Sequence, residues 1–349
     1  MILFLVFIFI IRSANSDICS DQTWYEICNN ARDIILSPEF PSQPLTCCCL
    51  SNQTQSALFH YPSIVPNGNP KIERYHYDQQ YFLQTVAKHG NFLRIGMAIA
   101  CWGDTCNLSK DKRKVLVEKK IAILLHTFEK TENDTLSLLF PSNFIFIPDH
   151  LFIRSNGYKE LINSTNALPK SIAEREPIIF WRGSSTGRIF SMVENDRYKM
   201  CLLAKNYSWV DAGITQAYSQ YSQKIYADNG VYRSYKNEYE WIKYRGIIDI
   251  DGSVNAWGLN WRLASGSVVF KVESNWTNAL IEKMIPWKHY ISLKEDFSDF
   301  KAFTSLITNE NFLPIFEKIA RNAFTLVKEF SFENEVDRVV ASLNDFWMA

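Results

Sequence analysis

The sequence predicts an α/β protein with two domains, each built around a parallel β-sheet. Its 349 residues exceed one ordinary hydrophobic core and fit two domains of roughly 150 residues each. Short apolar runs of strand length alternate with charged stretches of helical spacing, which is typical of parallel strands connected by helices. Hydrophobic residues make up 47% of the chain and aromatic residues 14%, so a disordered chain is excluded.

The charge balance excludes recognition of nucleic acid by the field of the whole protein. Lysine plus arginine and aspartate plus glutamate are equal at 37 each, so the formal net charge is zero. Nothing in this balance attracts nucleic acid or an anionic membrane surface. We therefore expect no nucleic-acid partner, and any site for an anion must be local.

The N-terminus has the pattern of a signal peptide over residues 1–16. Eleven apolar residues, Met1 to Ile11, precede Arg12, and Ala14 and Ser16 supply small residues for cleavage after Ser16. An uncleaved anchor is the alternative, but eleven residues fall short of the ~20 that span a bilayer. We expect no transmembrane span and a place in the secretory pathway, either in the endoplasmic reticulum lumen or secreted.

Glycosylation sequons and cysteines both agree with an oxidising lumen. Six sequons predict a glycoprotein, at Asn52, Asn107, Asn133, Asn163, Asn206 and Asn275. Eight cysteines predict disulfide bonds, at Cys19, Cys28, Cys47, Cys48, Cys49, Cys101, Cys106 and Cys201. Five of these lie in residues 17–75, which we expect to be an irregular, disulfide-stapled N-terminal segment; a Cys101–Cys106 bridge is also possible. Zinc is the competing explanation, but no cysteine pair has a partner pair at finger spacing.

The first predicted domain covers residues 76–170. Its expected strands are 92–101, 121–125 and 144–147, with a charged helix at 110–120. A polar stretch at 163–176, with Pro169 inside it, marks the boundary.

The second predicted domain covers residues 171–311 and repeats the same alternation. Its expected strands are 178–181, 247–250 and 267–272. Its expected helices are 189–195, 237–244 and 276–283. Residues 312–349 are expected to be C-terminal helices, since the apolar positions from Phe312 to Val327 follow helical spacing.

The loop from Trp181 to Arg188 has the composition of an anion-binding loop. Arg182, Gly183, Ser184 and Arg188 combine a glycine for close backbone approach, a hydroxyl donor and two cations that can neutralise a diphosphate. The loop follows a predicted strand and precedes a predicted helix, whose N-terminus favours anions. A plain turn is the alternative, because no Walker or dinucleotide fingerprint fits.

A second cluster comprises Asp249, Asp251, Gly252 and Ser253, at the end of a predicted strand. The two carboxylates could hold a divalent ion on a sugar nucleotide, or act as a glycosidase acid pair. They could equally be structural, one aspartate capping a loop and the other hydrogen-bonded at the edge of a ligand cleft.

Several motifs occur in a fixed order along the chain. They are Arg175-x-Pro177, Phe180-Trp-Arg-Gly-Ser-x-Thr-Gly187, Val210-Asp-Ala212, Tyr244-Arg-Gly-Ile-Ile-Asp-Ile-Asp-Gly252, Ser265-Gly-Ser267, Pro286-Trp-x-His-Tyr290 and Asp296-x-Ser-Asp299. This set of motifs resembles glycosyltransferase family 90, which includes capsule and lipopolysaccharide-modifying enzymes and Rumi-type protein O-glucosyltransferases. The resemblance extends from about residue 90 to 330.

The resemblance implies a GT-B-like fold, with two Rossmann-like domains facing across a cleft, and inverting transfer from a UDP-sugar. It implies no required metal or other cofactor, and it places Arg182, Gly183, Ser184, Arg188, Asp249, Gly252 and Ser253 at the donor. One departure is that Gly258 stands where Rumi-type enzymes have a nucleotide-contacting arginine. Arg262, one helical turn further on, is a candidate to replace it.

The expected general base is Asp104. Transfer to a hydroxyl requires a group that removes its proton, whereas UDP leaves without a strong acid. Asp104 follows the predicted strand ending at Cys101, where parallel sheets present ligands, and resembles the catalytic position of Rumi-type relatives. Asp149 is the rival candidate, and a structural capping aspartate at position 104 is the alternative.

The leading function is therefore a UDP-sugar-dependent hexosyl- or pentosyltransferase, with glucose or xylose as the sugar and a protein or glycan hydroxyl as acceptor. A catalytically inactive secreted family member that binds glycans or a partner protein is the alternative. A glycosidase has no support beyond the carboxylate pair.

Overall fold

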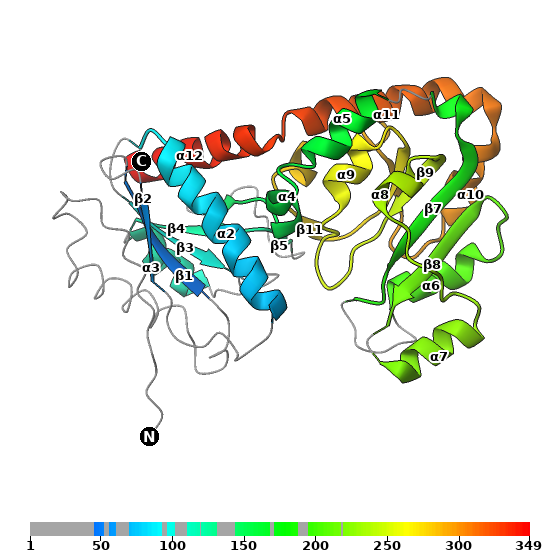
Figure 1. The fold of residues 1–349 in the computed structure, drawn as a ribbon, viewed down its shortest axis with the longest axis horizontal. Helices are drawn as coiled ribbons and strands as arrows, with labels where there is room; N and C mark the ends of the chain where they lie inside the picture. The colour runs from blue at the N-terminus through cyan, green and yellow to red at the C-terminus, as the bar shows by residue number, and fades with distance from the viewer. Residues whose placement is uncertain are drawn as a thin grey trace. The chain divides into compact units, whose positions relative to one another are not determined.

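The computed structural model describes most of the chain from residue 45 onward. The described segments are 45–51, 56–60, 70–92, 96–101, 110–118, 120–130, 144–167, 171–187, 195–217 and 219–349. The predicted signal peptide and residue Cys106 of the proposed bridge lie outside them. The chain divides into two compact units (Figure 1), one comprising Met1–Arg154 and Phe332–Ala349 and the other Ser155–Ser331.

The first unit contains a mixed five-stranded sheet in the order β2-β1-β3-β4-β6. Its strands and helices are β1 (Leu45–Ser51), β2 (Ser56–His60), β3 (Gly96–Cys101), β4 (Ile121–Leu125), β5 (Phe128–Glu129), β6 (Phe144–Phe146), α2 (Pro70–His89), α3 (Lys110–Glu118), α4 (His150–Arg154) and α12 (Phe332–Met348). Strands β3, β4 and β6 are parallel, as predicted, and all five residues of β4 are buried.

The region expected to be irregular, residues 17–75, contains two strands and the start of a helix. β1 pairs antiparallel with both β2 and β3, so it extends the parallel part of the sheet. The expected irregular structure was wrong here, because the segment shows no sustained period in sequence, although cysteine is a small hydrophobic residue suited to a strand; its disulfide bonds stay a prediction.

Helix α12 belongs to the first unit, although it follows the second unit in sequence. Its buried face includes Phe332 and Trp347. The ring of Phe332 meets that of Phe82 edge-on at 5.6 Å between centroids, and Trp347 lies 5.8 Å from Phe92. This apolar face ties the end of the chain to α2 and its neighbours.

The second unit contains a fully parallel five-stranded sheet in the order β12-β10-β9-β7-β8. The strands of this unit are β7 (Glu176–Ser184), β8 (Val210–Gln216), β9 (Tyr244–Asp249), β10 (Val268–Val272), β11 (Trp276–Thr277) and β12 (Ile291–Leu293), of which β11 is not part of this sheet. Its α-helices are α5 (Lys159–Ala167), α6 (Asp196–Ala204), α7 (Gln220–Asp228), α8 (Glu238–Trp241), α9 (Leu259–Ala264), α10 (Phe300–Thr304) and α11 (Leu313–Lys328). The predicted α/β architecture is therefore confirmed in both units.

The unit boundary falls at Arg154, earlier than the predicted boundary near residue 170. The reason is that α5 packs on the second unit, where Leu161 is buried in the core. The helix predicted at 276–283 was wrong, since this stretch forms β11 and a 3-10 turn at Ile281–Lys283. No α-helix in the described part of the chain is long and apolar enough to span a membrane.

Cys201 is a free thiol in the core of the second unit. Burial raises the pKa of this thiol to about 12, so it stays protonated. Among the eight cysteines expected to form disulfide bonds, Cys201 is therefore an exception.

Several motif residues form hydrogen bonds at the amino edge of the second sheet, where its strands begin. The Arg175 guanidinium donates to the Ser265 carbonyl at 3.1 Å and to the Ser267 hydroxyl at 2.7 Å. Arg245 Nε donates to the Arg175 carbonyl at 3.1 Å. Because these buried groups hydrogen-bond to one another, they stabilise the amino edge of the sheet. We therefore look for a ligand site at the opposite, carboxyl edge.

Candidate functional site

The strand order of the second sheet defines a switch point at its carboxyl edge. From β7 the chain adds β8 on one side, then returns to place β9 on the other side and continues outward to β10 and β12. In open α/β sheets, ligands bind outside the carboxyl ends of the strands at such a point. The site therefore lies where β7 and β9 end, at Ser184 and Asp249.

The loops that follow β7 and β9 approach each other closely at this edge. A Cβ atom added at Gly252 would lie 2.5 Å from Thr186 Oγ1 and 3.1 Å from an Arg197 nitrogen. The Ser253 hydroxyl is 3.4 Å from the Gly187 carbonyl oxygen. Glycine at 252 thus permits a contact between the two loops that a larger residue would obstruct.

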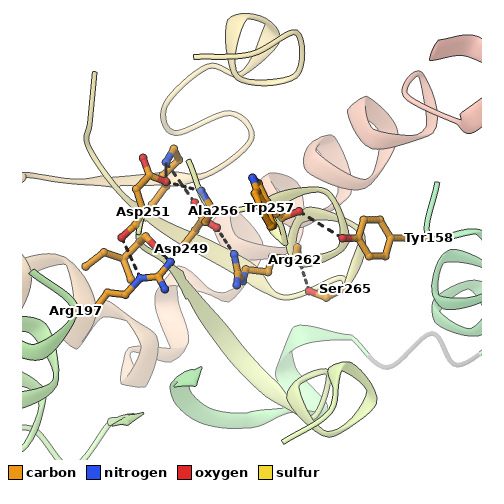
Figure 2. A network of polar contacts seen from close by, with 10 residues as sticks. Tyr158, Arg197, Asp249, Asp251, Ala256, Trp257, Arg262 and Ser265 are labelled. Carbon is orange, nitrogen blue, oxygen red and sulfur yellow. Dashed lines mark hydrogen bonds and ion pairs between the residues drawn. The ribbon is translucent and has the colours of Figure 1, made fainter. Parts of the chain in front are cut away.

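Arg197, from the first turn of α6, links both loops. Its Nε donates to the Asp251 carbonyl at 3.0 Å (Figure 2) and its Nη2 to the Ile250 carbonyl at 3.0 Å. Its Nη1 donates to the Ser184 carbonyl at 3.1 Å and to Thr186 Oγ1 at 2.6 Å. One guanidinium therefore occupies three backbone carbonyls and a hydroxyl at the switch point.

This arrangement makes the edge suitable for an anion. Carbonyl oxygens repel phosphate, and here Arg197 neutralises those nearest the switch point while adding a positive charge. Asn195 caps α6, accepting from the Tyr198 amide at 3.0 Å and donating to the Ser185 carbonyl at 2.9 Å. The Ser185 hydroxyl is buried, with no hydrogen-bond partner among the described residues. A hydroxyl in this position can donate a hydrogen bond to a ligand.

Asp249 lies at the end of β9, at zero exposure, and contacts Arg262 (Figure 2) as well as Lys271. Arg262 Nη1 donates to one carboxylate oxygen at 2.5 Å, and Lys271 Nζ lies 3.3 Å from the other. Burial works to lower the pKa of Lys271, but Asp251 and Asp249 more than offset it, so the pKa is raised. Asp249 therefore positions two cations, and a direct contact between Asp249 and the donor stays a prediction.

Asp251 shapes the loop after β9. Its Oδ1 accepts from the Ala256 amide at 2.9 Å and lies 3.5 Å from Lys271 Nζ, and its Oδ2 accepts from the Ser274 hydroxyl at 2.5 Å. The carboxylates at 249 and 251 are thus already balanced by cations and donors. No group of three or more His, Cys, Asp or Glu side chains within the described segments could hold a metal ion.

Gly258 and Arg262 share one space at the start of α9. A Cβ atom at Gly258 would lie 3.1 Å from the Arg262 guanidinium carbon and 2.5 Å from Trp261 Nε1. The Arg262 side chain therefore occupies the volume beside the Gly258 backbone. Its guanidinium also lies 5.3 Å from the Trp261 ring centroid.

Arg182 contacts strand β8, whereas Arg197 contacts the loops after β7 and β9. Arg182 Nη2 contacts both carboxylate oxygens of Asp211 at 2.9 Å, and its Nη1 donates to the Trp181 and Asp211 carbonyls. The guanidinium carbon lies 4.4 Å from the centroid of the Phe180 ring. Since Asp211 balances its charge, Arg182 joins β7 to β8, and a diphosphate contact by Arg182 stays a prediction. Arg188 and Asp104 lie outside the described residues.

The carboxyl edge of the parallel strands in the first unit carries titratable groups. His126 directly follows β4, and its Nε2 is hydrogen-bonded to Gln79 Nε2 of α2. Burial lowers the pKa of His126 to about 4, although the backbone of Pro148 and Ile147 acts in the opposite direction. The imidazole is therefore neutral at physiological pH.

Asp149 and His150 follow β6 at the same edge. Asp149 Oδ1 accepts from the backbone amides of Leu151 and Phe152 at 2.9 and 3.0 Å, so it caps α4. Burial raises the pKa of Asp149 to about 7, although these amides act against it. Burial also lowers the pKa of His150 to about 3, with smaller contributions from two nearby basic groups.

The family model for Glycosyl transferase family 90 matches residues 127–337, more than half of the chain. The chain belongs to glycosyl transferase family 90. The family expected from the sequence motifs is thereby confirmed.

Two curated relatives of this family 90 chain are protein O-glucosyltransferases. The chain is 30% identical over 122 residues to protein O-glucosyltransferase 2 of Danio rerio, covering 34% of this chain and 22% of that protein. It is 24% identical over 178 residues to protein O-glucosyltransferase 3 of Rattus norvegicus, covering 51% of this chain and 30% of that protein. The matches therefore span less than a third of the length of either relative.

Solved glycosyltransferase structures also resemble the family 90 chain distantly. A glycosyltransferase from Rickettsia africae matches with a TM-score of 0.45 and 10% identity, over 82% of this chain and 83% of that one. A pneumococcal O-GlcNAc transferase in complex with UDP and GlcNAc matches with a TM-score of 0.39 and 11% identity, over 68% of this chain and 55% of that one.

Two important residues of this family 90 site were missed from the sequence, and each carries a signal. Arg197 is a cation in the first turn of a helix, where the helix dipole disfavours it, so it needs a specific partner. Lys271 interrupts the buried apolar strand β10, and a lysine there requires a buried carboxylate.

Proposed function

We propose that the chain is an inverting glycosyltransferase that moves a sugar, glucose or xylose, from a UDP-sugar to a hydroxyl group of a protein or glycan. The proposal requires no metal or other cofactor. Family 90 membership and the two relatives named as protein O-glucosyltransferases support it.

The observation that carries the proposal is the meeting of two loops at the switch point of the second sheet. The loops after β7 and β9 are joined there by Arg197 and by the glycine contact at 252. In sheets of this order, that place receives the phosphates of a nucleotide.

The diphosphate of the donor would bind to the loop after β7. Ser184 and Ser185 supply hydroxyls, the N-terminus of α6 supplies a partial positive charge, and Arg197 supplies a full one. Arg188, with Arg182 and Gly183 at the end of β7, completes the predicted set on this side.

The loop after β9 would bound the donor on its other side. Gly252 and Ser253 face the first loop, and Asp249 holds Arg262 from below. Because the Arg262 side chain fills the space beside Gly258, it is suited to replace the arginine that Rumi-type enzymes have at that position. Arg262 Nε is buried with no hydrogen-bond partner among the described residues, which leaves one donor for a ligand.

Asp104 would act as the base that removes the proton of the acceptor hydroxyl. As the oxygen attacks the anomeric carbon from the face opposite UDP, the sugar–phosphate bond breaks and UDP leaves, which inverts the configuration. Strand β3 ends at Cys101, shortly before Asp104, and it is parallel to β4. Asp149 is the rival base, and the near-neutral pKa that burial gives it suits proton removal.

The secretory pathway, with the chain in the endoplasmic reticulum lumen or secreted, is the proposed location. It rests on the signal-peptide pattern at residues 1–16 and on the sequons. Disulfide bonds among the N-terminal cysteines belong to the same proposal.

A UDP-release assay with a panel of UDP-sugars tests the proposed activity. We expect release above background with UDP-glucose or UDP-xylose when extracts supply folded protein acceptors, and none without the chain. UDP binding without release from any sugar would instead favour the inactive binding module. The absence of both UDP binding and UDP release would contradict the proposed function.

A further inference from the structure

Three sequons lie in the described residues, and they differ in their position relative to the proposed donor site. Asn163 is on α5, and Asn206 lies between the end of α6 and the start of β8, on the amino edge of the sheet. Asn275 is the third residue after β10, on the carboxyl edge where the proposed site lies. The side chains of all three asparagines are exposed.

Asn275 is directly connected to the carboxylate network of the site. The preceding residue, Ser274, donates its hydroxyl to Asp251 Oδ2 at 2.5 Å. Consecutive Cα atoms are about 3.8 Å apart, so Asn275 begins within one residue of this network. The following residues Trp276 and Thr277 are buried, which leaves the asparagine as the outward-facing member of the sequon.

We propose that Asn275 carries an N-linked glycan that stands at the rim of the donor site and restricts the approach of large molecules to it. The inference rests on the proposed secretory location and on the proposed donor site. Its chemical basis is the complete Asn275-Trp276-Thr277 sequon, in which the asparagine side chain is exposed.

The modification itself is a condensation carried out by the host glycosylation enzyme. The amide nitrogen of Asn275 loses a proton and bonds to C1 of an oligosaccharide carried on a lipid diphosphate. The C1–O bond breaks, and the lipid diphosphate leaves with the bonding electron pair. Because the Asn275 side chain is exposed in the fold, the glycan can be accommodated without unpacking the core.

Mass spectrometry of the full chain secreted from eukaryotic cells tests the modification. Treatment with peptide N-glycosidase in ¹⁸O water should convert Asn275 to ¹⁸O-labelled aspartate. An unmodified Asn275 in a protein whose Asn206 is occupied would overturn the inference while leaving the secretory location intact. If no sequon is occupied, both the inference and the secretory location fail.

Capture on UDP-agarose tests the position of the glycan at the rim. We expect Asn275→Gln to increase capture several-fold, while binding of free UDP in solution stays the same. The matched variant Asn206→Gln, which removes a glycan from the amino edge, should leave capture unchanged. Equal capture of wild type and Asn275→Gln would overturn the rim position, whereas loss of free UDP binding by all forms would count against the donor site.

Discussion

Replacing Arg197 with alanine should separate the two loops of the proposed donor site. The substitution removes four hydrogen bonds of 3.1 Å or less, shared between the loops after β7 and β9. Arg197 is only half-buried and the freed carbonyls can bind water, so we assign only about 1 kcal/mol to each bond and about 4 kcal/mol in total. A loss of about 2 kcal/mol in UDP binding corresponds to roughly a 30-fold weaker dissociation constant.

Isothermal titration calorimetry with UDP, together with thermal unfolding, measures this effect. Arg197→Lys keeps the charge but has a single nitrogen that cannot reach both loops, so we expect roughly a tenfold loss. Arg182→Ala is the comparison variant, because the charge of this second arginine of the predicted set is already balanced by Asp211 on β8, so we expect a smaller loss of UDP affinity. Unchanged UDP affinity in a folded Arg197→Ala protein, with a loss of 2 kcal/mol or so in Arg182→Ala, would refute the assignment and favour Arg182 as the diphosphate ligand.

Three further predictions concern the loop contact, the base and the pH dependence. Gly252→Ala should weaken UDP binding about tenfold in calorimetry, because its Cβ overpacks the contact between the loops; unchanged affinity would show that the contact is unimportant. Asp104→Asn should lower turnover by roughly two orders of magnitude and keep UDP affinity, and near-normal UDP release would transfer the role to Asp149. The lowered pKa values of His126 and His150 mean that the unfolded chain gains two protons as pH falls below about 6.5, while the raised pKa of Asp149 means that the folded state gains one below about 7. As the pH falls from about 6.5 to 4, these groups should therefore lower the free energy of unfolding by about 1.4 kcal/mol per pH unit, and by about twice that in Asp149→Asn. If urea unfolding at several pH values gives the same pH dependence of this free energy in both proteins, the prediction is contradicted.

The strands that could be predicted from the sequence are those buried on both faces. β4, β7, β9 and β10 read as apolar runs, because a parallel sheet covered by helices excludes water from both sides. The edge strand β8 was missed, since its half-buried residues include Asp211 and lack a long apolar run. An apolar run in the sequence indicates a buried strand, and an edge strand is less buried, so its sequence pattern is weaker.

The site could be predicted as two loops but not as a set of contacts. The composition of residues 182–188 and 249–253 identified two turns that the structure brings together, because a glycine and hydroxyl loop at a strand end is visible in the sequence. Which arginine faces the loops depends on the direction of the side chain. Arg182 lies within β7, opposite Gly213 of β8, and turns towards that strand, whereas Arg197 arrives from the following helix. Such tertiary contacts leave no periodic pattern in the sequence.

Hydrogen–deuterium exchange of the intact chain with and without saturating UDP tests the central claim most directly. The claim is that UDP binds at the carboxyl edge of the second sheet, between the loops after β7 and β9. We predict slower amide exchange in residues 184–187 and 250–256 when UDP is bound, with no change around Ser265 and Ser267 at the amino edge. Protection confined to the amino edge, or to the first unit, would contradict the claim.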